Sequence, residues 1–194
     1  MNIEFRSDRA VISGYVNCVE RESRPLQGTT GKFIEVIKQG AFKRSLEKRP
    51  NVDLLLNHNT NRLLGSTSAG TLELIEDNIG LKATATITDK EVIDKLRNNK
   101  ISGWSFGFKL IDDFVKPKAN NLVKRYVKAL ELFEVSLIDE TMTPAYASTS
   151  VELRNNTECL IEHRYNNNSI DENTPDPDAE KYNKFLEEIK RGLK

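Results

Sequence analysis

The segment ISGWSFGFKL, residues 101–110, predicts a β-strand with two different faces. Its large apolar side chains alternate with small or polar ones, and alternate residues of a strand point to opposite sides of a sheet. The bulky face, which we expect in the core, comprises Trp104, Phe106, Phe108 and Leu110. Ser105 lies on the other face between Gly103 and Gly107, where the missing side chains would leave room for an extended peptide to approach its hydroxyl.

The segment ELFEVSLID, residues 131–139, predicts a second strand of this kind. Alternation places Phe133, Val135 and Leu137 on one face and Glu134 and Ser136 on the other. A glutamate on a sheet face is usually solvated, but a glutamate beside a histidine can hold the imidazole in one tautomer and stabilise its cationic form. Glu134 is therefore a candidate partner for a histidine.

His58 is the candidate histidine, because the other one, His163, lies at the edge of an Asn-rich segment. Histidine is the side chain best suited to accept and return a proton near neutral pH. Since His58 follows the apolar run VDLLLN (residues 52–57), we expect it where a strand leaves the core, half buried and half reachable. A hydrogen-bonded histidine with no catalytic role explains the same pattern.

Ser105, His58 and Glu134 are the three residue types of a catalytic triad. A serine hydroxyl is a poor nucleophile until an adjacent base removes its proton, and that base must be oriented. Glycine-flanked serines also occur at simple β-bulges, and triads recur in several chain orders. The residues alone therefore leave both the triad and purely structural roles open.

The other segments predict mostly short strands. The expected strands are Ala10–Val16, Lys32–Ile37, Val52–Leu56, and the two flanking a hairpin turn at Asp77 and Asn78. Two helices are expected, one over residues 40–49 before Pro50 and one opened by a capping box of Thr88 and Glu91 and running through Asn98. This order predicts an α+β fold, a mainly antiparallel β-sheet or barrel with a few short helices.

Composition excludes several classes of protein. The 29 basic and 29 acidic residues give a formal charge of +0, so no overall basic field argues for nucleic acid. No apolar run approaches the ~20 residues of a membrane span, and MNIEFRSDRA lacks the apolar core of a signal peptide, so we expect a cytoplasmic protein. The two cysteines, Cys18 and Cys159, are not clustered with histidines, and we expect no metal or other cofactor.

The C-terminal part differs in composition from the rest. Residues 152–194 hold 10 acidic and 7 basic residues, which leaves 19 acidic and 22 basic in residues 1–151. We expect a catalytic domain over residues 1–151 and a mostly flexible linker over 152–178, whose stretch RYNNNSIDENTPDPD is nearly empty of large apolar residues. Apolar residues at helical spacing predict a short amphipathic helix over 179–194, which would dock on the domain or on a partner.

The domain resembles the prohead serine protease family of tailed bacteriophages, a group distantly related in fold to the herpesvirus assemblins. The matching segments, in the order of the family, are ISGYVN, IKQGAF, VDLLLNHN, LLGS, DNIGLKATA, ISGWSFGF, LFEVSLID and PAYA. The resemblance implies an assemblin-like fold with Ser105 as nucleophile, His58 as base and Glu134 as the residue that orients His58. Asp139 is the second candidate for that third role, and residues 138–145 are a candidate source of oxyanion donors by analogy.

The resemblance also implies a function. Proteins of this family enter the immature capsid in the bacterial host cytoplasm and cleave the scaffolding region of the capsid protein, or a separate scaffold protein, and then themselves. The expected partners are thus the major capsid protein or its scaffolding segment, and the protease itself is expected as a homo-oligomer such as a dimer. A catalytically idle capsid-assembly protein that keeps this fold is one alternative. A β-barrel that binds nucleic acid is another, although its basic stretch over residues 116–128 also suits a solvated hairpin.

Overall fold

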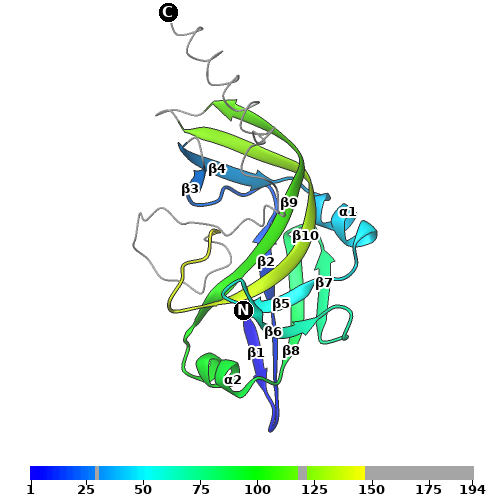
Figure 1. The fold of residues 1–194 in the computed structure, drawn as a ribbon, viewed down its shortest axis with the longest axis vertical. Coiled ribbons are helices and arrows are strands. Elements are labelled where there is room, and N and C mark those ends of the chain that lie inside the picture. Colours follow the sequence, from blue (N-terminus) through cyan, green and yellow to red (C-terminus); the bar gives the residue numbers. More distant parts are fainter. Residues whose placement is uncertain (29–30, 118–121, 147–194) are drawn as a thin grey trace, which may run out of the picture.

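Strands dominate the computed structural model, which describes residues 1–28, 31–117 and 122–146 (Figure 1). In these residues the chain forms two sheets and two short helices, so the expected mainly-β fold with few helices is confirmed. The elements are β1 (Asn2–Phe5), β2 (Ala10–Cys18), β3 (Leu26–Gly28), β4 (Gly31–Ile37), α1 (Ala41–Lys48), β5 (Asp53–Leu56), β6 (Asn59–Ser66), β7 (Leu72–Glu76), β8 (Gly80–Ile87), α2 (Lys90–Arg97), β9 (Ile101–Pro117) and β10 (Val123–Asp139).

The larger sheet is organised around β10. β9 pairs antiparallel with β10 along nearly its whole length, and Figure 1 shows the two long strands running side by side. On the opposite edge, β4 pairs with the first part of β10 and β5 with the last part, both in parallel. β3 and β6 extend the sheet by antiparallel pairs with β4 and β5. The strand pairing is therefore mainly antiparallel, as expected, with two exceptions, because β4 and β5 both run in the direction of β10.

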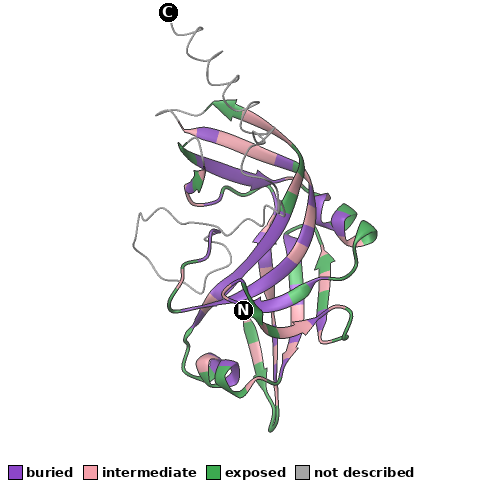
Figure 2. Ribbon diagram, in the orientation of Figure 1, coloured by how far each residue is buried: buried purple, intermediate pink, exposed green. Residues whose placement is uncertain are grey.

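The smaller sheet has the antiparallel order β1-β2-β8-β7. The predicted hairpin joins β7 to β8, and the carboxylate of Asp77 accepts hydrogen bonds from the backbone N–H groups of Ile79 and Gly80. Apolar residues of both sheets form a common core, in which Phe106 lies edge-on to Phe42 at 5.3 Å between ring centroids. Figure 2 shows long buried stretches along β9 and β10, while the outer sides of the helices are exposed.

The two predicted helices are present, with different caps. The N-terminus of α1 is held by Glu76 of β7, whose carboxylate accepts from the backbone N–H groups of Gly40 and Lys43. The N-cap of α2 is Asp89, whose carboxylate accepts from the backbone N–H of Val92. The expected capping box of Thr88 and Glu91 is therefore wrong by one residue, because the carboxylate of Asp89 occupies the capping position.

A β-bulge in β10 changes which residues share a face. The register shifts between Leu132, opposite Phe108, and Glu134, opposite Gly107, so Phe133 has no direct partner on β9. Leu132 is fully buried, whereas Phe133 is only half buried. Our expectation that Phe133 shares the core face of Val135 was thus wrong, because simple alternation does not hold across a bulge.

The C-terminal expectations lie outside the described residues. These are the linker over 152–178, the helix over 179–194 and the two side chains Cys159 and His163. Neither α1 nor α2, the helices of the described residues, is long and apolar enough to cross a membrane.

Candidate active site

His58 lies in the two-residue turn between β5 and β6. Asn57 and His58 both have positive φ, 54° and 56°, as in the type I′ turns that join short hairpins. The turn is fastened to β10, since the backbone N–H of Asn57 donates to the carbonyl of Leu137 (2.9 Å) and the Asn57 side-chain oxygen accepts from the N–H of Asp139 (3.0 Å). The parallel pairing of β5 with β10 thus carries His58 to the end of β10.

Glu134 is in direct contact with the imidazole of His58. Its Oε1 lies 2.6 Å from Nδ1 of His58, and the exposed fractions of the two side chains are only 3% and 4%. An ionised carboxylate can only accept, so Nδ1 carries the proton of this hydrogen bond and Nε2 is left as the acceptor in the neutral ring. The other carboxylate oxygen, Oε2, accepts from the hydroxyl of Ser136 at 2.6 Å.

Ser105 lies on the same side of the sheet as Glu134. It stands opposite Ser136 in the β9–β10 ladder, and Gly107 stands opposite Glu134. Residues directly opposite each other in an antiparallel pair project to one face. The hydroxyl of Ser136 also accepts a hydrogen bond from the backbone N–H of His58 at 3.1 Å. The three predicted triad residues therefore lie around one short stretch of the β9–β10 ladder.

Two expectations about access to the site need correction. His58 is 8% exposed, so it is buried rather than half reachable, because the β5–β6 turn is hydrogen-bonded to β10, and Ser105 is buried as well, at 5% exposed. The space beside Gly107 is also not open to a substrate. It is filled by the carboxylate of Glu134, which a Cβ at residue 107 would overlap.

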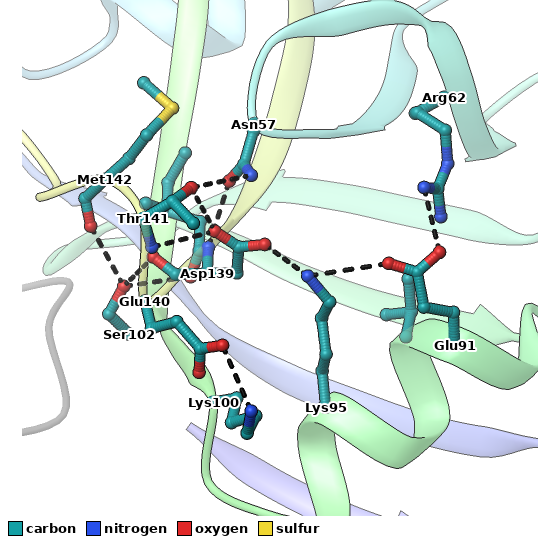
Figure 3. A network of polar contacts seen from close by, with 12 residues as sticks. Asn57, Arg62, Glu91, Lys95, Lys100, Ser102, Asp139, Glu140, Thr141 and Met142 are labelled. Atoms are coloured by element: carbon teal, nitrogen blue, oxygen red, sulfur yellow. Dashed lines mark hydrogen bonds and ion pairs between the residues drawn. The ribbon is translucent and has the colours of Figure 1, made fainter.

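Asp139, the second candidate for orienting His58, is engaged elsewhere (Figure 3). Its carboxylate binds the ammonium of Lys95 at 2.5 Å and accepts from the hydroxyl (2.6 Å) and the backbone N–H of Thr141. Burial alone would raise the pKa of this carboxyl, but hydrogen bonds from Lys95, Thr141 and Asn57 outweigh burial and hold the pKa well below its ordinary value. Of the two candidates, Glu134 is therefore the one that contacts His58.

Further contacts extend the network around Asp139 to α2, β6 and β9. Lys95 also binds Glu91, which pairs with Arg62 of β6 at 3.0 Å, as Figure 3 shows. The hydroxyl of Ser102 donates to the carbonyls of Ile138 and Asp139. These contacts tie the start of the segment 138–145 to α2 and β9, and the hydrogen bond between Asn57 and Asp139 ties it to the turn that carries His58.

Sequence reasoning missed the role of one buried residue, Ser136. Its hydroxyl links Glu134 to the backbone of His58, and its position two residues after Glu134 on the same strand face was the available signal. The described residues hold no cluster of three or more His, Cys, Asp or Glu side chains arranged to bind a metal ion.

Comparison with known families gives one match. The family model described as caudovirus prohead serine protease matches residues 1–164, which is most of the chain. The chain belongs to this family. No curated protein and no solved structure matches it.

Membership of the prohead serine protease family supports a role as a capsid-maturation protease. The matched range includes all of the predicted triad and the whole of the described structure. The contact between His58 and Glu134 is of the kind by which a carboxylate orients a histidine, and it lies on the face of the ladder that bears Ser105.

Proposed function

We propose that this protein is a serine endopeptidase of capsid maturation in which Ser105 is the nucleophile, His58 the general base and Glu134 the residue that orients His58. The observation that carries the proposal is the 2.6 Å contact between His58 Nδ1 and Glu134 Oε1, buried beside the strand position of Ser105. Family membership supports the reaction class independently of this geometry. The likeness to herpesvirus assemblins is part of the proposal and rests on sequence resemblance.

The reaction follows from the placement of the protons. With the Nδ1 proton donated to Glu134, His58 Nε2 takes the proton of the Ser105 hydroxyl as Oγ bonds to the carbonyl carbon of the substrate. The imidazolium, stabilised by Glu134, returns that proton to the leaving amine, and the C–N bond breaks to leave an acyl-enzyme. Water then attacks the ester carbon while His58 takes a water proton, and the imidazolium passes that proton to Oγ as the ester C–O bond breaks, which releases the new carboxyl terminus and restores the Ser105 hydroxyl.

The proposed substrates are the scaffolding region of the capsid protein, or a separate scaffold protein, and the protease itself. Self-cleavage is expected in the segment 164–178, because its polar composition, with few large apolar residues, favours the extended form in which a protease binds its substrate. The proposed place of action is the interior of the prohead in the bacterial host, with the protease present as a homo-oligomer.

The test is co-expression of the protein with the capsid protein of its own phage, followed by intact-mass measurement of both. Wild type should cleave the capsid protein, and Ser105→Ala and His58→Ala should each abolish cleavage by a similar factor, since triad residues act as a unit. Glu134→Gln should be less damaging, because it removes orientation and charge support but neither nucleophile nor base. Ser13→Ala, on β2 of the smaller sheet, is the serine control, and it should retain cleavage.

The same experiment separates the proposal from its alternative. Cuts that appear equally with wild type and Ser105→Ala come from host proteases. A wild-type protein that leaves capsid protein and itself intact would point to a catalytically idle assembly protein with this fold.

A further inference from the structure

Ser136 occupies the position that joins the parts of the candidate site. The residue is fully buried, and its hydroxyl donates to Oε2 of Glu134 at 2.6 Å while accepting the backbone N–H of His58 at 3.1 Å. In the ladder it stands directly opposite Ser105. One hydroxyl therefore contacts both predicted partners of the nucleophile.

We propose that Ser136 is a positioning residue that fixes the carboxylate of Glu134 and the backbone of His58 in the geometry that catalysis needs; this rests on the proposed function of the site. A hydroxyl has one proton to donate and lone pairs to accept with, and Ser136 uses both capacities. It acts through Glu134 and His58 rather than on the substrate.

The carboxylate of Glu134 is held at both oxygens. Oε1 faces Nδ1 of His58 and Oε2 faces the Ser136 hydroxyl, so rotation of the carboxylate would break both hydrogen bonds. In this orientation His58 is kept with its proton on Nδ1 and its acceptor on Nε2. Loss of the Ser136 hydroxyl frees the carboxylate to rotate, and the ring is then no longer restricted to the productive tautomer.

The backbone of His58 also needs support. A residue with a side chain is strained at a φ of 56°, and a buried N–H without an acceptor is costly. Ser136 supplies the acceptor for that N–H. The same hydroxyl thus holds the imidazole from two directions, through the carboxylate and through the main chain.

The first experiment reads the tautomer of His58 and does not depend on proteolysis. It uses the full chain with Ser105→Ala, which prevents self-cleavage, and His163→Gln, which removes the second histidine signal. Nitrogen-15 NMR of the imidazole should show one neutral tautomer, protonated at Nδ1. Adding Ser136→Ala should produce a mixture of the two tautomers, whereas an unchanged single tautomer would overturn the proposal. If Ser136→Ala does not fold, Ser136→Gly, which also removes the hydroxyl and adds no volume, takes its place with the same two outcomes.

The second experiment is a double-mutant cycle with a peptide that spans the cleavage junction mapped for wild type. Ser136→Ala should lower kcat by about 10- to 100-fold with little change in KM. In the Glu134→Gln background the same change should cost less than about threefold, because the partner through which Ser136 acts is already impaired. Equal losses in both backgrounds would overturn the claim that Ser136 acts through the carboxylate of Glu134.

Ser45→Ala is the matched control. Ser45 is also a buried serine, and its hydroxyl accepts the backbone N–H of Leu132 in β10 at 2.8 Å, but it contacts neither Glu134 nor His58. It should lower thermal stability and leave kcat unchanged. Failure of the proposed function would appear separately, as cleavage that survives Ser105→Ala.

Discussion

Gly107 on β9 lies directly opposite Glu134 on β10, and the carboxylate of Glu134 fills the place where a side chain at residue 107 would stand. The glycine that seemed in the sequence to make room for a substrate instead makes room for the residue that contacts His58. A carboxylate can lie flat against the sheet here only because its neighbour on β9 has no Cβ.

Gly107→Ala should therefore impair the site more than the fold. The added methyl group would push Glu134 away from His58, and we expect kcat/KM to fall at least about tenfold, with a loss of roughly 1–3 kcal/mol in unfolding free energy from overpacking. The control is Gly70→Ala, where φ is 69° but a Cβ would meet no atom within 4 Å. It should cost stability and no activity. Equal activity losses in the two variants would show that Gly107 has no special relation to the site.

The Asn57–His58 turn predicts an order of stability among substitutions at residue 57. Asn57 has a φ of 54°, which glycine adopts freely and alanine does not. Both substitutions remove the side-chain oxygen that accepts from the backbone N–H of Asp139, so they differ only in how well they tolerate this φ. Asn57→Ala should therefore be less stable than Asn57→Gly by about 1 kcal/mol in urea denaturation. At the exposed residue Asn51, the glycine variant should not be more stable than the alanine variant. Alanine as stable as glycine at residue 57 would contradict the turn geometry.

The Lys95–Asp139 pair predicts how stability depends on pH. The folded state lowers the pKa of Asp139, so it favours the ionised carboxylate. This contribution is fully present above the ordinary pKa of about 3.9 and is lost as the pH falls through the lower folded value. Asp139→Asn should cost about 2 kcal/mol of unfolding free energy at pH 7 and progressively less than that below about pH 4.

The hydrogen bond to Asp139 raises the pKa of the Lys95 ammonium more than burial lowers it. The stability that the Lys95 ammonium contributes is therefore present below about pH 10 and is lost only above that pH. Denaturant unfolding of wild type and Asp139→Asn at pH 7, 5 and 3 measures the acid side. Asp112→Asn, which breaks the exposed pair with Lys128, is the control and should change stability by less than about 0.5 kcal/mol at each pH. A pH-independent gap between wild type and Asp139→Asn would rule out this account of Asp139.

The composition of the C-terminal segment predicts that it serves packaging. Deleting residues 164–194 should leave cleavage of an added substrate nearly unchanged, yet reduce the amount of protease carried into proheads. Phe185→Asp combined with Ile189→Asp should imitate the deletion, because two charges on an apolar contact face would have to be desolvated on binding. Immunoblots of purified proheads, beside an assay with free substrate, measure both effects. Loss of activity toward the free substrate would show instead that the segment supports the catalytic domain.

Much of the fold could be predicted from local patterns. The alternation of residues 101–110 correctly gave the buried face of Trp104 and Phe106, since a strand has a fixed period of two. The same rule placed Ser105 and Glu134 opposite the bulky faces of their strands. Their catalytic roles stay a prediction.

Other features depend on contacts that no local pattern encodes. The bulge at Phe133 is set by the pairing of β10 with β9, and it decides that Glu134 meets Gly107. The parallel pairing of β5 with β10 joins segments far apart in the chain, so the burial of His58 could not be predicted. Ser136 looked like any small strand residue, because one of its two hydrogen-bond partners, the backbone N–H of His58, comes from a distant part of the chain.

The parallel placement of β5 also has a consequence for the order of folding. β9 and β10 meet across a short connection, with Pro117 opposite Val123, whereas His58 and Glu134 are 76 residues apart. Closing a long loop costs more entropy than closing a short one, and non-local pairings form more slowly. A newly made chain can thus bring Ser105 beside Ser136 early, but it lacks the imidazole until β5 has joined the sheet. On the proposed mechanism, a molecule in which β5 has not yet joined the sheet would lack the base of Ser105 and would not cleave its neighbours.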